Sequence, residues 1–175
     1  MSLQRLNECV DWLNDCIGWE VINILNAVTN VFGLLAFNIP GLSWYDRALV
    51  GLTIMASVLM HLSERKHYLP GIKPFSLWAK WFLFLDRYTA IQMGSILIYY
   101  TWRYNLWEMI FPKSYIWVAI LVGLLSVLMS ETVFVHNTTF DKIGFVVFHT
   151  IWHFLAYSII FNIMYLVTKE RIINS

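Results

Sequence analysis

The sequence predicts an all-α protein, a polytopic helical bundle in a membrane, and its composition supports this prediction. Hydrophobic residues make up 59% of the chain and charged residues only 13%, about half the charged share of a typical soluble domain. A chain of 175 residues could not keep so much apolar surface away from water. The net charge of +1, without a dense basic run, excludes a nucleic-acid-binding surface, and the apolar content excludes disorder.

Stretches without charged residues predict about five spans within a single membrane domain, residues 1–175. A helix crosses a hydrocarbon core of about 30 Å with about 20 residues. We therefore expect spans near residues 20–40, 47–63, 82–102, 114–131 and 142–168. Pro70, Gly71 and Pro74 predict a turn, followed by an interfacial helix that leads into the third span.

The segment before the first span, residues 1–18, has its own periodicity. Its apolar residues recur at helical spacing: Leu3, Leu6, Val10, Leu13 and Ile17. This pattern predicts an amphipathic helix on the membrane surface, and the alternative is a solvated tail with chance periodicity. Cys9 and Cys16 lack the CxxC spacing, so they indicate neither a disulfide framework nor a thiolate metal site.

Polar residues inside the predicted spans gather at one depth. Ser57 and His61 lie near the end of the second span and Asp86 at the start of the third. His149 and His153 lie in the first half of the last span. If the chain crosses the membrane five times, these three positions lie near the side of the membrane that holds the N-terminus. Because ionisable groups are costly in a bilayer, their concentration indicates a functional site.

The spacing of these residues favours a metal centre. Residues at i and i+4 share a helix face, so His149 and His153 direct two imidazoles toward one point, and Ser57 lies one turn before His61. Three histidines around an open fourth position are the pattern of catalytic zinc. We therefore expect His61, His149 and His153 to bind zinc. Asp86 would then hold or deprotonate the activated water, and Ser57 would hydrogen-bond the water or the substrate.

Each of these features also has a plainer interpretation. An HxxxH pair in an aromatic-rich helix often packs without a metal. Asp86 could be a helix N-terminal acid beside Arg87, and Ser57 a small packing residue. Haem would need axial groups that face each other from opposite sides, and the sequence singles out no such pair. The zinc interpretation therefore depends on the histidines, Asp86 and Ser57 occurring together at one depth.

These motifs resemble the CREST superfamily of membrane hydrolases, which includes alkaline ceramidases, adiponectin-receptor-like proteins, a phospholipase branch and the fusion protein myomaker. The matching residues are Ser57 with His61, Asp86, and His149 with His153. The resemblance implies zinc on the three histidines, with Asp86 and Ser57 assisting hydrolysis of a lipid amide or ester bond. It also implies up to seven spans. The chain has room for about two fewer, so a homo-oligomer or a partner membrane protein would complete the pocket wall.

The resemblance to ceramidases extends to the N-terminal region, where Asp11 precedes the asparagine-rich stretch Asn26-Ala-Val-Thr-Asn30. In ceramidases this region builds a calcium site beside the zinc. Here the candidate ligands are Asp11, Asn14 and Asn23, and Asn23 stands where the ceramidase pattern has Glu. Calcium needs several oxygen ligands at once, so the resemblance implies at most a weak calcium site.

The leading hypothesis is therefore a zinc-dependent intramembrane lipid hydrolase with a membrane lipid as its substrate. The alternative is a non-enzymatic membrane remodelling or receptor-like protein that keeps the metal as a structural staple. A third hypothesis is a small transporter or scaffold without a metal. The basic residues divide almost evenly between the two predicted sides, so the sequence fixes neither the orientation nor the compartment of this multi-pass protein.

Overall fold

All regular structure in the described part of the chain is helical, as the sequence predicts. The computed structural model describes residues 18–63, 71–110, 114–134 and 138–173. Its helices are α2 (Trp19–Thr29), η1 (Asn30–Asn38), α3 (Trp44–Ser63), η3 (Phe75–Trp78), α4 (Ala79–Arg103), α5 (Trp107–Ile110), α6 (Ser114–Thr132) and α7 (Thr139–Ile173). The predicted amphipathic helix at the N-terminus lies outside the described residues, apart from Gly18.

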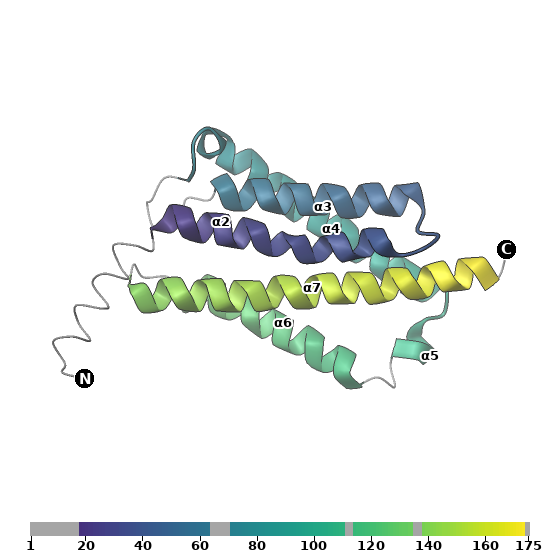
Figure 1. Cartoon of the computed structure of the whole chain (residues 1–175). Coiled ribbons are helices and arrows are strands. Elements are labelled where there is room, and N and C mark those ends of the chain that lie inside the picture. The colour runs from purple at the N-terminus through teal and green to yellow at the C-terminus, as the bar shows by residue number, and fades with distance from the viewer. Residues whose placement is uncertain (1–17, 64–70, 111–113, 135–137, 174–175) are drawn as a thin grey trace.

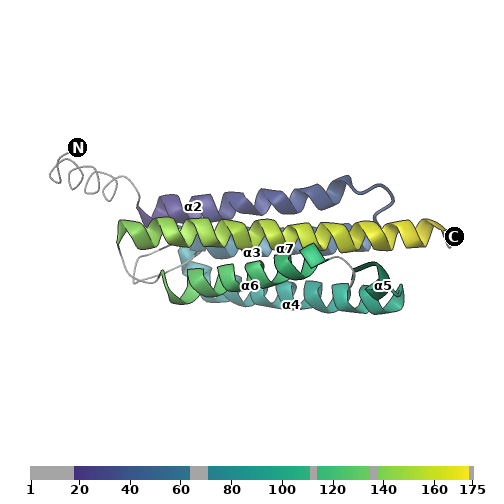
Figure 2. The same cartoon turned by 90° about the horizontal axis from the view of Figure 1, so that it is seen from below.

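Consecutive long helices run in opposite directions (Figure 1). Helices α2, α4 and α7 run one way, and α3 and α6 run the other way. Helix α7 extends along the whole bundle and packs against α2, η1, α4 and α6; Figure 2 shows the same arrangement from below. This order brings the end of α3 and the starts of α2, α4 and α7 together. We call this end of the bundle, which carries His61, the histidine end.

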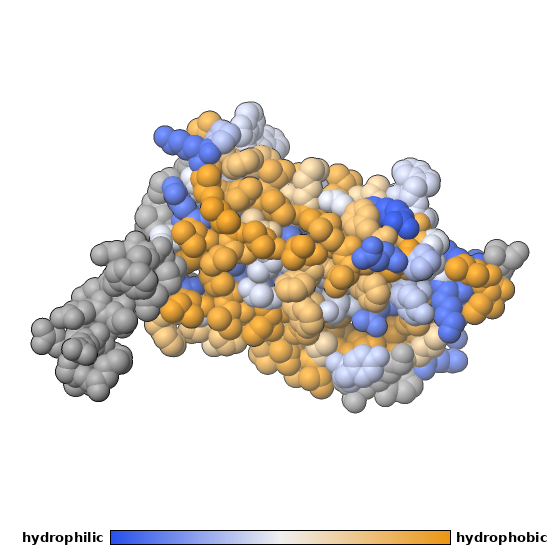
Figure 3. All heavy atoms as spheres, viewed as in Figure 1, coloured by the Kyte–Doolittle hydropathy of each residue, from blue (hydrophilic) through white to orange (hydrophobic). Residues whose placement is uncertain are grey.

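Four segments of the described chain are long and apolar enough to cross a membrane. They are Glu20–Asn38, Trp44–Ser63, Tyr115–Thr132 and Phe140–Ile173. Apolar residues cover the middle of the bundle, and hydrophilic residues gather near its two ends (Figure 3). This distribution is that of a helical membrane protein, because apolar side chains can face outward only where the solvent is hydrocarbon.

The third predicted span, residues 82–102, differs from the other four. Residues 82–102 do form a helix, but α4 begins earlier, at Ala79, and includes the residues that we expected in an interfacial helix. In the described residues from 71 onward, the 3-10 turn η3, Phe75–Trp78, precedes it. Lys80, Asp86 and Arg87 lie in the first part of α4. With 25 residues the helix is long enough to span, but it does not reach the hydropathy and low charge of the four segments above.

The first span changes its helical type at Asn30, where α2 gives way to the 3-10 helix η1. The Asn30 side-chain amide donates to the carbonyl oxygens of Asn26 (3.2 Å) and Ala27 (3.3 Å). An asparagine that bonds these carbonyls competes with the backbone amides that would continue the α-helix. The sequence pattern does not predict this change, because η1 keeps the apolar composition of a span.

A network of polar side chains closes the end of the bundle opposite the histidine end. Asp46, at the start of α3, is fully buried. It accepts hydrogen bonds of 2.6 Å from Ser43, from Tyr100 of α4 and from Arg171 of α7. The Arg171 guanidinium also donates to the Tyr104 hydroxyl, at 3.0 Å. One buried carboxylate therefore ties three helices together.

We predict that Asp46→Ala lowers the free energy of unfolding in detergent by about 2–4 kcal/mol, because it leaves the partly buried Arg171 and the Tyr100 hydroxyl without their acceptor. Chemical denaturation followed by circular dichroism measures this loss. Glu108→Ala, on the exposed side of α5, is the control. A loss below about 0.5 kcal/mol for Asp46→Ala, which is the usual size of a surface change, would show that the network does not hold the helices.

Candidate metal centre

Three histidines from two helices meet inside the bundle at the histidine end. His61 lies in the last turn of α3, and His149 and His153 lie one turn apart on α7. All three side chains are buried. Their ligand-capable ring atoms all lie within 4.8 Å of one another. The structure thus confirms that residues 88 positions apart in the chain form one group that could hold a metal ion.

The spacing of two of the rings is close to that required by one tetrahedral metal. The Nε2 atoms of His61 and His149 are 3.0 Å apart. Two nitrogens bound to one zinc at about 2.0–2.1 Å in tetrahedral geometry are separated by about 3.3 Å. A shift of a few tenths of an ångström therefore suffices to convert this contact into two metal ligands.

A hydroxyl on α2 contacts the ring of His153. The Thr29 Oγ1 donates its hydrogen to the Asn26 carbonyl oxygen at 2.6 Å. The same oxygen lies 2.5 Å from Nδ1 of His153. With its hydrogen directed to that carbonyl, Thr29 can accept a hydrogen bond from Nδ1 in the tautomer of His153 that carries a proton there. In that tautomer the Nε2 lone pair of His153 is available for a metal, which is the usual arrangement of a histidine ligand.

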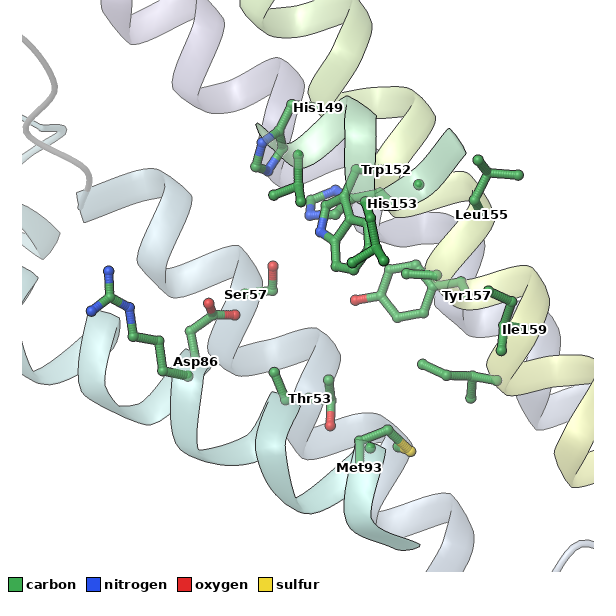
Figure 4. A pocket seen from close by; sticks show the side chains of 18 of the residues that line it. Thr53, Ser57, Asp86, Met93, His149, Trp152, His153, Leu155, Tyr157 and Ile159 are labelled. Carbon is green, nitrogen blue, oxygen red and sulfur yellow. The ribbon is translucent and has the colours of Figure 1, made fainter. Parts of the chain in front are cut away.

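Ser57 and Asp86 border the same cavity as the histidines. The Asp86 carboxylate on α4 and the Ser57 hydroxyl on α3 point into one space (Figure 4). His149 and His153 enter that space from α7 on the opposite side (Figure 4). Ser57 is buried and Asp86 is half-buried. The five residues predicted from sequence therefore converge on one cavity.

The cavity extends from the histidines along the bundle, with a volume of about 530 Å³. Residues of α3, α4, α6 and α7 line it, and most of them are apolar. Gly94 of α4 is one of the lining residues, and a Cβ added there would meet no atom within 4 Å. A pocket of this size accepts an organic molecule or part of a lipid.

Two residues that face the centre were not predicted. Tyr157 follows His153 by one turn, is buried, and donates its hydroxyl hydrogen to Asn30 Oδ1 at 2.6 Å. It lines the cavity and points into it (Figure 4). The sequence holds a signal for it, because His149, His153 and Tyr157 repeat at i+4. No comparable signal marks Thr29, whose role depends on contact between α2 and α7.

The predicted calcium site cannot be traced in the structure, since Asp11 and Asn14 lie outside the described residues. Asn23 is described, and its side chain is buried in α2. In the described part of the chain, the only cluster of at least three residues suited to a metal is the histidine group.

Comparisons with known proteins identify no relative. No protein-family model matches the chain, and no curated protein or solved structure shows significant similarity to it. The fold and the site define the class of protein: a helical membrane protein with a buried three-histidine group beside an apolar cavity.

We predict that the purified protein carries close to one zinc per chain and that His153→Ala carries none, because two of the three ligands cannot retain the ion through purification. Elemental analysis after purification in mild detergent measures the content. Ser158→Ala is the control on the same helix, because the Ser158 hydroxyl donates to the Phe154 carbonyl within α7. Wild-type protein without bound metal would leave the histidines as packing residues.

Proposed function

We propose that the protein is a zinc-dependent intramembrane hydrolase that cleaves an amide or ester bond of a lipid. The observation that carries this proposal is the position of the three buried histidines at the end of an apolar cavity that also holds Ser57 and Asp86. A structural metal site is usually closed by four protein ligands. In the described residues three histidines converge, and all three border the cavity, so a substrate in the cavity would lie beside a bound ion.

The chemistry of the donor set supports zinc. Imidazole nitrogen is a common ligand of zinc. Because neutral imidazoles bring no negative charge, three of them leave the ion with its full positive charge. When bound in such a site, zinc acts as a Lewis acid and lowers the pKa of water to about 7, which supplies a nucleophile for hydrolysis.

The other residues of the cavity have complementary tasks in this proposal. Asp86 accepts a proton from the attacking water and returns it to the leaving group. The Ser57 hydroxyl donates a hydrogen bond to the substrate carbonyl oxygen, where negative charge develops. Tyr157 holds a second hydroxyl in the same space, oriented by Asn30. The apolar walls accommodate a hydrocarbon chain and keep bulk water out.

The resemblance to the CREST superfamily agrees with this proposal, because the residues that carry the resemblance are the ones that meet in the cavity. Both the amide bond of a ceramide-like lipid and the ester bond of a phospholipid fit the chemistry. A receptor-like or remodelling protein with a structural metal would need the histidines but neither the Asp86 carboxylate nor the Ser57 hydroxyl.

The test is Asp86→Asn, which keeps the size of the side chain but removes the base. We expect it to lower kcat on a ceramide or phospholipid substrate by about 100-fold or more, with zinc content unchanged. Glu108→Gln on α5, a similar change at the opposite end of the bundle, should keep full activity. Hydrolysis is followed by mass spectrometry of lipids in micelles. Zinc-loaded wild type that hydrolyses neither lipid class, or Asp86→Asn that hydrolyses at the wild-type rate, would contradict the proposal.

A further inference from the structure

The amide of Asn26 stands out among the buried polar groups of the described chain. Its side chain is fully buried in α2, yet neither Nδ2 nor Oδ1 has a hydrogen-bond partner. An unsatisfied buried amide destabilises a fold, and the penalty is severe in an apolar bundle. Asn30, one turn later on the same helix, is satisfied by Tyr157 and by backbone carbonyls. Packing alone therefore gives no reason for an amide at position 26.

The register between α2 and α7 places Asn26 beside the metal centre. The two helices run in the same direction (Figure 1). Thr29 contacts His153, and Asn30 contacts Tyr157. Moving back by about one turn on both helices leads from Thr29 and His153 to Asn26 and His149, and from Asn30 and Tyr157 to Asn26 and His153. Asn26 therefore lies level with the two histidines of α7. Asn26, Thr29 and Asn30 lie on one face of the first span, because residues three and four positions apart share a face of a helix.

The orientation of His149 determines what this neighbour can do. Its Nε2 faces the Nε2 of His61, on the side where the metal would lie. Its Nδ1 therefore lies on the side of the ring away from that contact. A histidine that binds a metal through one nitrogen typically donates the N–H of the other to an oxygen, which fixes its orientation. Thr29 provides this oxygen for His153.

We propose that Asn26 is a positioning residue of the metal centre, whose Oδ1 accepts a hydrogen bond from Nδ1–H of His149 when the metal is bound. Helix α2 then supplies both outer oxygens, Asn26 for His149 and Thr29 for His153, although it supplies no metal ligand. The inference rests on the metal site of the proposed function and is independent of hydrolysis.

The test uses Asn26→Leu, which has a similar size but no polar atoms. We expect the affinity for zinc, measured by competition with a chelator, to fall 10- to 100-fold, the usual effect of losing such a partner. The metal-free variant should unfold at the same temperature as metal-free wild type or higher, because an unsatisfied amide has been removed. A residue with a purely structural role would not weaken metal binding while preserving the stability of the metal-free protein.

Conservative and control variants complete the experiment. Asn26→Asp keeps an oxygen at this place and should keep zinc affinity within about threefold of wild type. Thr29→Val should weaken binding as Asn26→Leu does, whereas Thr101→Val, at a buried hydroxyl that bonds Leu97 in α4, should not. With cobalt in place of zinc, Asn26→Leu should shift the visible absorption bands of the ion.

The outcomes separate this inference from the proposed function. Wild-type protein that binds no zinc refutes the metal centre itself. Wild type that binds zinc, together with unchanged affinity and cobalt spectrum in Asn26→Leu, refutes the role of Asn26 alone. If Asn26→Leu does not fold, then Asn26→Ala, with the same zinc and cobalt measurements, decides the question.

Discussion

In an apolar helical bundle, a buried polar group must find its partner on another helix, and this constraint organises the structure. The parallel contact between α2 and α7 is the clearest example, because Thr29 meets His153 and Asn30 meets Tyr157. These contacts fix the rotation of α7 about its own axis. That rotation directs His149 and His153 toward His61 on α3 rather than toward lipid. The metal-binding geometry thus depends on a helix that contributes no ligand.

The two ends of the bundle meet the same constraint in different ways. At one end, the buried Asp46 carboxylate is neutralised by Arg171 and joined to Tyr100, which locks α3, α4 and α7 together. At the other end, three buried imidazoles converge beside Ser57 and Asp86. The first end is held by an ion pair, whereas the second gathers side chains that could bind a cation. The apolar cavity lies between the two ends and is bordered by the same helices.

Patterns within single helices predict much of this arrangement. The i, i+4 spacing of His149 and His153 and the up-and-down order of the spans suffice to bring His61, Ser57 and Asp86 to the same cavity. Contacts between distant segments are not visible in such patterns: 124 residues separate Thr29 from His153, and 125 separate Asp46 from Arg171. The structure forms helix α4 over the predicted third span, although α4 is not among the four segments apolar enough to cross a membrane. The sequence pattern does not predict the 3-10 helix that begins at Asn30.

X-ray absorption at the zinc edge tests the central claim most directly, since it reports the atoms around the ion in the intact protein. Three imidazoles and an open position predict only nitrogen or oxygen neighbours at about 2.0–2.1 Å, four in total, with outer scattering from about three imidazole rings. A sulfur neighbour at about 2.3 Å would place the ion on a cysteine. A shell of six oxygens without imidazole scattering would likewise contradict a metal centre formed by His61, His149 and His153.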